Sequence, residues 1–101
     1  MAGGVNQIGA ENLTVTTAAV ALTGVTGKQP RHALIYVGTS PIRFRADGTA
    51  PTSTTGMYVA AGSYLDWTNV DNDYLSMMNK VQFIRDATAG ADATLAVGYY
   101  D

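Results

Sequence analysis

One histidine and one acidic segment are the residues whose types first suggest catalysis or metal binding. His32 is the only histidine in the 101-residue chain, and cysteine is absent. No second histidine or cysteine exists to complete a metal site or a catalytic Cys–His pair, so we interpret His32 as a strand-edge residue. NVDND, residues 69–73, imitates the start of a calcium loop, but Tyr74 and Lys80 stand where that loop needs glycine and glutamate. We interpret it as a solvated turn or a helix cap.

The sequence also contains neither a recognisable nucleophile turn nor a phosphate-binding loop. None of Ser40, Ser53, Ser63 and Ser76 stands in a G-x-S-x-G nucleophile turn. The segment GTSPIR has neither the lysine nor the spacing of a phosphate-binding loop. The sequence thus disfavours an enzyme and implies no cofactor.

Charged side chains gather on one face of a predicted strand. Ile42 and Phe44 alternate with Arg43 and Arg45, and Asp47 follows on the polar face. One interpretation is a solvated face with ion pairs worth less than about 1 kcal/mol each. The other is a docking surface, because guanidinium groups bind a partner's carboxylates in bidentate geometry. In either case we expect Asp47 to pair with Arg45.

Aromatic residues leave a similar choice. Tyr58, Tyr64 and Trp67 fall on two adjacent predicted strands, and Tyr99 and Tyr100 lie at the end of the sequence. We expect most of them in the core or at its rim. An exposed ring would instead be an interface anchor or a platform on which a sugar stacks.

Composition limits the partners. Hydrophobic residues make up 47% of the chain and charged residues 14%, which is typical of a folded domain with a weakly charged surface. The net charge is −2, so nucleic acid and anionic lipid are disfavoured as ligands. No segment approaches the roughly 18 to 20 apolar residues of a membrane span, and a secretory signal is not recognisable. We therefore expect a soluble protein without a membrane partner.

Turn residues divide the chain into short strands. We expect residues 1–11 to form a flexible arm and 12–101 a single β-domain. Leu34 to Val37 are apolar in succession, which predicts a central strand buried on both faces. The segment 71–81 has helical spacing at Tyr74, Met77, Met78 and Val81, for one or two turns at most. The predicted strands lie near 12 to 16, 19 to 23, 33 to 38, 41 to 47, 56 to 60, 63 to 67, 80 to 86 and 93 to 99.

This pattern predicts an all-β fold. About eight short strands with at most one short helix indicate an antiparallel β-sandwich or small barrel, of jelly-roll or immunoglobulin-like type. So small a core, without disulfides, also favours self-association.

Two longer segments carry a family resemblance. The run PIRFRADGTAPTSTTGMYVAAGSYLDW, followed after a spacer by VQFIRDATAGADATLAVGYYD, resembles small structural proteins of tailed bacteriophages. The match covers roughly residues 12–101 and consists of strands and turns, not of catalytic residues. It implies a virion component, most plausibly a decoration (cement) protein that binds the major capsid protein on the head exterior after synthesis in the host cytoplasm. It also favours a trimer.

The hydroxyl-rich segment 49–55 then gains a candidate role. Because Pro51 limits its freedom, the loop could hydrogen-bond a neighbouring subunit at low ordering cost, although an ordinary surface loop remains the alternative. A neck, tail or baseplate component and a carbohydrate-binding adhesin are the other functions left open. An adhesin predicts an exposed aromatic shelf near Tyr64 and Trp67, whereas decoration predicts that those rings are buried. The candidate interface comprises Arg43, Arg45, Asp47, Pro51, Thr52, Thr54 and Thr55.

Overall fold

The computed structural model describes residues 7–23, 32–68 and 80–100. They form eight strands, as predicted, in two four-stranded antiparallel sheets. The strands are β1 (Gln7–Val15), β2 (Val20–Ala21), β3 (His32–Gly38), β4 (Ile42–Arg45), β5 (Met57–Val59), β6 (Tyr64–Thr68), β7 (Gln82–Arg85) and β8 (Ala93–Tyr100).

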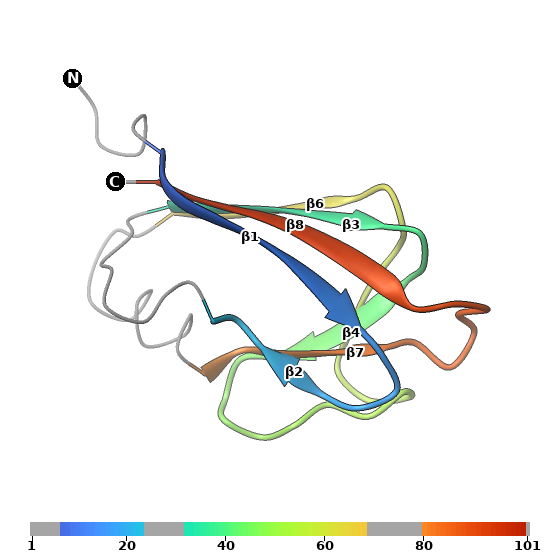
Figure 1. Ribbon diagram of the computed structural model, residues 1–101. Coiled ribbons are helices and arrows are strands. Elements are labelled where there is room, and N and C mark those ends of the chain that lie inside the picture. The colour runs from blue at the N-terminus through green and yellow to red at the C-terminus, as the bar shows by residue number, and fades with distance from the viewer. Residues whose placement is uncertain (1–6, 24–31, 69–79, 101) are drawn as a thin grey trace.

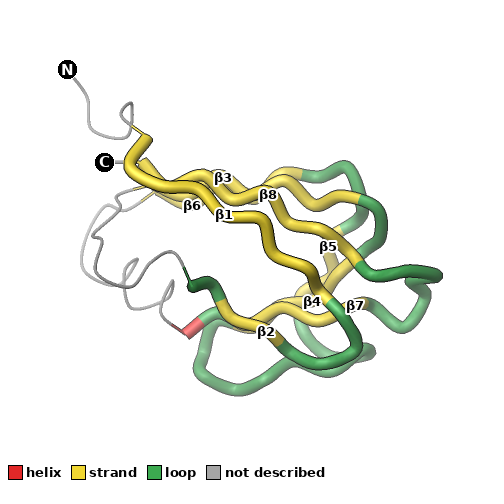
Figure 2. Tube along the Cα trace, in the orientation of Figure 1, coloured by secondary structure: helices red, strands yellow, loops and turns green. Residues whose placement is uncertain are grey.

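The two sheets lie face to face as a β-sandwich (Figures 1 and 2). The strand orders are β1-β8-β3-β6 and β2-β7-β4-β5. Strands β1 and β8, β2 and β7, β3 and β6, and β4 and β5 are therefore antiparallel partners, as in one long hairpin rolled up on itself. This order is that of a jelly roll and not that of an immunoglobulin domain.

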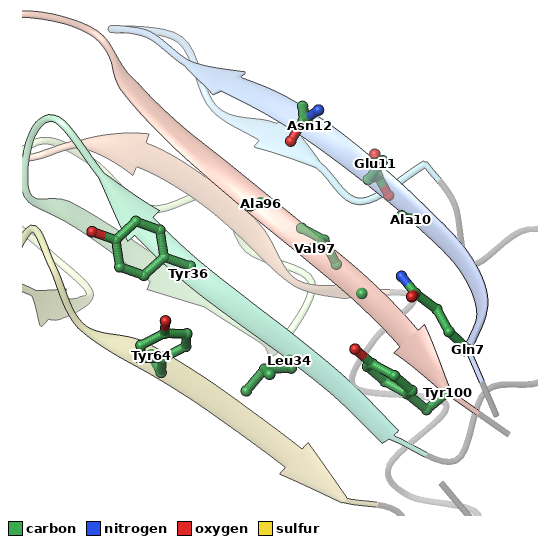
Figure 3. A pocket seen from close by; sticks show the side chains of 11 residues that line it. Gln7, Ala10, Glu11, Asn12, Leu34, Tyr36, Tyr64, Ala96, Val97 and Tyr100 are labelled. Atoms are coloured by element: carbon green, nitrogen blue, oxygen red, sulfur yellow. The ribbon is translucent and has the colours of Figure 1, made fainter. Parts of the chain in front are cut away.

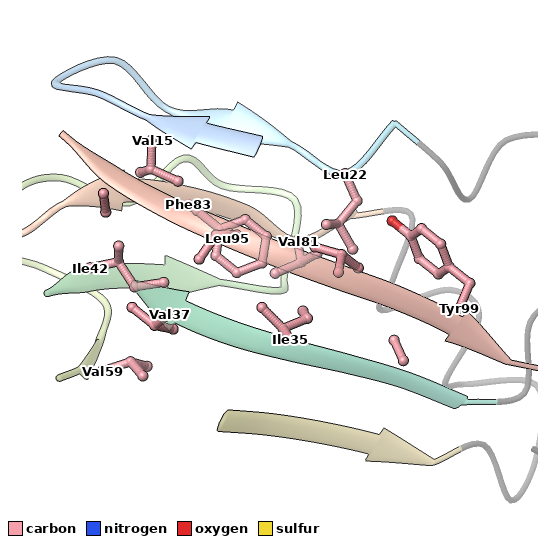
Figure 4. Packing of buried hydrophobic residues seen from close by; sticks show 13 residues of the cluster. Val15, Leu22, Ile35, Val37, Ile42, Val59, Val81, Phe83, Leu95 and Tyr99 are labelled. Atoms are coloured by element: carbon pink, nitrogen blue, oxygen red, sulfur yellow. The ribbon is translucent and has the colours of Figure 1, made fainter. Parts of the chain in front are cut away.

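Alternating side chains build the core between the sheets. In β8, Leu95, Val97 and Tyr99 are buried while Thr94 and Ala96 are exposed, which confirms the predicted alternation. Phe83 of β7 and Ile35 of β3 are fully buried on the facing strands (Figure 4). Burial of large apolar side chains of this kind is the dominant favourable term in folding.

Trp67 belongs to this core and not to the surface. Its indole stacks on Phe83 with ring centroids 6.5 Å apart and meets the edge of Phe44 at 5.6 Å. The ring is half-buried at the rim of the hydrophobic cluster. Trp67 therefore contributes to packing between the two sheets.

Strand β3 differs from its prediction. It is central, between β8 and β6, but of the apolar run from Leu34 to Val37 only Ile35 and Val37 face the core. Leu34 is half-buried and Tyr36 is exposed, because no further layer of described residues covers the outer face of this sheet. The unbroken apolar run of β3 therefore gives the sheet an apolar outer face; it does not indicate a strand that is buried on both faces.

Two other expectations change at the edges of the described chain. Strand β1 begins at Gln7, so residues 7–11 of the predicted arm are strand, paired with β8 through a register that shifts between Gln7 and Gly9. Backbone hydrogen bonding to β8 thus extends the strand by five residues. Residues 1–6, and residues 71–79 of the predicted helical segment 71–81, lie outside the described residues.

Candidate functional site

The loop between β4 and β5, residues 46–56, carries five of the seven candidate interface residues, and the other two, Arg43 and Arg45, lie in β4; we call this loop the hydroxyl loop. It does not project freely but runs along the outer side of the β2-β7-β4-β5 sheet, away from the other sheet (Figure 1). Pro51 is buried, while Thr52, Ser53, Thr54 and Thr55 are exposed. The loop therefore presents hydroxyl groups from an anchored backbone.

A small bridge fixes the tip of this loop. The amide of Thr52 donates to the carbonyl of Thr55 at 3.2 Å, and the amide of Thr55 donates back to Thr52 at 3.2 Å. Their hydroxyls lie 2.7 Å apart, within hydrogen-bond distance. The carbonyl of Ser53 accepts from the amide of Ala87 at 2.9 Å, which ties the tip to the turn after β7.

Arg43 stabilises the same loop from beneath. Its Nε donates to Asp86 Oδ1 at 2.6 Å, and Nη1 donates to the carbonyl of Gly56 at 3.0 Å. The guanidinium carbon also lies 5.7 Å from the ring centroid of Tyr58. Since these contacts occupy the guanidinium, Arg43 links the loop to β7. This is an internal role that differs from the predicted projecting docking group.

Asp86 is the buried centre of this arrangement. It also accepts from the amide of Thr88 at 2.9 Å and from the Thr88 hydroxyl at 2.5 Å. The Thr88 hydroxyl, then its amide, then Arg43, hold the pKa of Asp86 below its ordinary value. The carboxylate is therefore held charged by its donors.

Arg45, the last residue of β4, forms the predicted pair with Asp47 of the hydroxyl loop, and both side chains are partly exposed. Arg45 Nη2 donates to Asp47 Oδ2 at 2.5 Å and Nε donates to Oδ1 at 3.2 Å, a bidentate geometry. Oδ1 also accepts from the amide of Thr49 at 3.1 Å. These hydrogen bonds, led by that from Arg45, lower the pKa of Asp47 to about 2, and Asp47 raises the pKa of Arg45.

Between the hydroxyl loop and the turn after β7 lies an open depression. Its volume is about 510 Å³. Arg85 borders it and donates from Nη1 to Asp92 Oδ1 at 2.7 Å and from Nη2 to the carbonyl of Ala89 at 3.1 Å. The depression is lined by Thr17, Pro51, Thr52, Ser53, Ile84, Arg85, Asp86, Ala87 and Ala89.

A second surface lies on the opposite side of the sandwich, on the outer face of β1-β8-β3-β6. Tyr36 and Tyr64 lie at one end of a shallow depression of about 390 Å³ and Tyr100 at the other, with Leu34 between them (Figure 3). We call this depression the tyrosine trough. The exposed fraction of Tyr64 is 64% and that of Tyr36 is 39%.

The sequence indicated only part of this trough. Tyr64 was a candidate for exposure, and it is exposed, whereas its neighbour Trp67 is packed into the core. Tyr36 and Asn12 were not singled out, although Tyr36 alternates with two buried residues and so had to face outward. The shelf that an adhesin predicts near Tyr64 and Trp67 is thus replaced by one built from Tyr36, Tyr64 and Tyr100. The burial that decoration predicts for both rings is met by Trp67 and not by Tyr64.

His32 lies beside the trough, where its Nε2 is in hydrogen-bond contact with Asp66 Oδ1. Its ring is also 5.4 Å from that of Tyr100, centroid to centroid. Within residues 7–23, 32–68 and 80–100, no group of three or more His, Cys, Asp or Glu residues is placed to hold a metal ion. In the same ranges no helix is long and apolar enough to cross a membrane.

The described residues therefore form a small jelly-roll β-sandwich with two surface features, an anchored hydroxyl loop and a tyrosine trough. No protein-family model, curated protein or solved structure matches the chain significantly.

Proposed function

We propose that this protein is a non-enzymatic virion component, a decoration protein that attaches to the major capsid protein on the outside of a phage head. The resemblance of the segments around the hydroxyl loop and β8 to phage structural proteins supports this proposal. The jelly roll agrees with it as a fold used in viral capsids, although a fold alone does not assign a function.

The observation that carries the proposal is the anchored hydroxyl loop. Thr52 and Thr55 bridge the tip, Pro51 is buried beneath it, and Ser53 and Thr54 are exposed at its end. A loop that is already ordered loses little conformational entropy on docking, so even weak hydrogen bonds contribute to affinity. Repetition of such contacts over a shell gives the occupancy that a cement protein needs.

The charged residues have different roles in this proposal. Arg45 and Asp47 lie at the exposed edge of the loop and are available to a partner as a pair. Arg43 supports docking only by holding the loop through Asp86 and Gly56. We therefore assign the contact surface to Arg45, Asp47, Thr52, Ser53, Thr54 and Thr55.

The test is co-sedimentation with capsids that lack the protein. Thr54→Lys places a long charged side chain at the exposed tip while leaving the bridge between Thr52 and Thr55 intact. We expect this variant to leave capsids bare. Ala61→Lys, which adds the same charge at an exposed residue of the turn between β5 and β6, is the control and should decorate normally. Equal occupancy for parent, Thr54→Lys and Ala61→Lys would refute docking through the loop.

Self-association is also part of the proposal, with a trimer expected from the resemblance. Met57 and Tyr58 of the edge strand β5 are 64% and 52% exposed, which leaves apolar surface beside unpaired strand backbone. Light scattering on purified protein should give about three times the mass of the 10.6 kDa chain. The proposed self-association would be contradicted if the protein were monomeric in solution at high concentration and were also bound to the capsid as single copies.

A further inference from the structure

Two small residues of β8, Ala96 and Gly98, line the tyrosine trough, and glycines lie close to two of its aromatic rings. At Gly98 an added Cβ would lie 3.0 Å from Cε1 and from the hydroxyl oxygen of Tyr100, so that ring folds back over the glycine. At Gly38 an added Cβ would lie 3.4 Å from Cε2 of Tyr36. The broad face of Tyr36 points away from the sheet (Figure 3). The trough therefore offers the ring face of Tyr36 to a ligand, with the Tyr64 ring inclined to it by 53°.

Strand register brings these residues together on one face. Asn12 pairs with Ala96, Ala96 with Tyr36, and Tyr36 with Tyr64, so one row crosses all four strands. Tyr100 lies four residues further along β8 than Ala96, about 13 Å at about 3.3 Å per residue. The two aromatic ends of the trough are thus spaced for an elongated ligand.

The chemistry of the lining favours a neutral, polyhydroxylated ligand. Glu11 is the one charged residue among the described lining residues, and its carboxylate accepts hydrogen bonds from Thr23 and Tyr99. Among the lining residues that the structure describes, none is cationic and so none attracts an anion. The amides of two β1 residues border the trough: that of Asn12 lies across the sheet from Tyr36, and that of Gln7 lies beside Tyr100 (Figure 3).

A pyranose ring has one kind of surface for each of these groups: an apolar C–H face for the aromatic rings and hydroxyl groups for the amides. Its C–H face packs on an aromatic ring, while its hydroxyls both donate to and accept from amide and phenol groups. The depression of about 390 Å³ lies within the usual size of small-ligand sites. The Gln7 amide already donates to the carbonyl of Gly9 at 3.3 Å, whereas a purely apolar ligand placed over Asn12 would separate its amide from water without replacing the hydrogen bonds.

From these contacts we propose that the tyrosine trough binds a neutral oligosaccharide, with sugar rings stacked on Tyr36, Tyr64 and Tyr100. This activity is additional to capsid docking, because the trough and the hydroxyl loop lie on the outer faces of different sheets. A decoration protein with such a site would give the particle a weak, repeated affinity for glycan.

Titration of the isotope-labelled protein with cellotetraose, maltotetraose and β-1,4-galactotetraose, followed by amide chemical shifts, tests the proposal. We expect at least one of these probes to shift the amides of Tyr36, Ala96, Gly98 and Tyr100 in a saturable manner. The absence of a saturable shift with all three overturns the proposal, as does a saturable shift confined to other residues.

Variants then distinguish stacking from adventitious contact. Tyr64→Ala and Tyr100→Ala should each weaken binding about tenfold, while Tyr64→Phe keeps most of it. Tyr58→Ala removes an equally exposed tyrosine from the other sheet and should bind like the parent. Unchanged binding in both trough variants, with folding verified by thermal unfolding, would refute the assignment.

A second copy of the chain is the competing occupant of this face. If it covered the trough, Tyr64→Ala and Tyr100→Ala would turn an oligomer into a monomer, and the parent would bind none of the three sugars. That result would overturn the proposal. The capsid-docking variant Thr54→Lys should bind sugar like the parent, so failure of either function can be recognised separately.

Discussion

Arg43 Nε and Asp86 Oδ1 meet at 2.6 Å although 43 residues separate them in the chain. The carboxylate is buried, and the guanidinium side chain is 24% exposed. This pair joins β4, the turn after β7 and, through Gly56, the end of the hydroxyl loop. It is the connection on which the shape of the proposed capsid-binding surface depends.

Replacing Arg43 therefore removes structure as well as charge. Arg43→Ser leaves a buried carboxylate without its cationic partner, which is among the more damaging changes that a point mutation makes. We expect the thermal midpoint to fall by about 10 to 20 °C. Arg45→Ser is the matched control, because its partner Asp47 is exposed, and should shift the midpoint by less than about 5 °C. Equal shifts in the two variants would contradict the internal role of Arg43.

Lowering the pH should destabilise the fold within a defined pH range. The pKa of Asp47 is about 2 and that of Asp86 is also below the ordinary value of 3.8. Since both are lower in the folded state than in the unfolded state, their stabilising contribution is complete above about pH 4 and is lost as the pH falls through the folded values. Urea midpoints measured from pH 6 to pH 2 should fall most steeply below pH 4.

The same titration assigns the effect to one carboxyl. Asp86→Asn should be less stable than the parent at pH 6 and should show a flatter acid dependence, because the buried carboxylate is gone. Asp47→Asn should follow the parent closely, since its ion pair is at the surface. An acid transition that is unchanged in Asp86→Asn would refute this account.

The backbone conformation and close packing of the hydroxyl loop require glycine at position 56. Its φ is +115°, and an added Cβ would lie 2.9 Å from the carbonyl oxygen of Phe44 and 3.3 Å from Cβ of Pro51. Gly56→Ala should therefore lower the free energy of unfolding by about 3 kcal/mol or more, from backbone strain plus the clash. Gly62→Ala has a similar left-handed backbone but open space around it, and should cost only about 1 to 2 kcal/mol. Urea unfolding of both variants compares the two costs; similar losses would show that the clash is relieved.

Neighbouring residues of β3 should respond very differently to truncation. Ile35 is fully buried, so Ile35→Ala should cost about 2 to 5 kcal/mol through lost burial and an unfilled cavity. Tyr36 faces outward, so Tyr36→Ala should cost no more than about 1.5 kcal/mol while removing one wall of the trough. Denaturant unfolding measures both values. A comparable loss in the two variants would mean that the outer face of β3 is covered.

Local patterns in the sequence predicted the features whose partners are near in the chain. Alternation placed Leu95, Val97 and Tyr99 on the buried face of β8, and the two-residue period placed Arg45 beside Asp47. The count of eight strands and the antiparallel sandwich followed from turn residues at short intervals. In each case the physical cause acts over a few residues, so the sequence carries it directly.

What lies against a strand face was decided by the tertiary structure. Alternation showed that Arg43 leaves the core but not that Asp86 would meet it, and an apolar run in β3 did not show whether a second layer would cover Tyr36. The tyrosine trough likewise joins Asn12 to Tyr64 through two intervening strands, β8 and β3. Periodicity specifies which way a side chain points, whereas the pairing of distant strands specifies what it meets there, and that pairing is set by packing of the whole core.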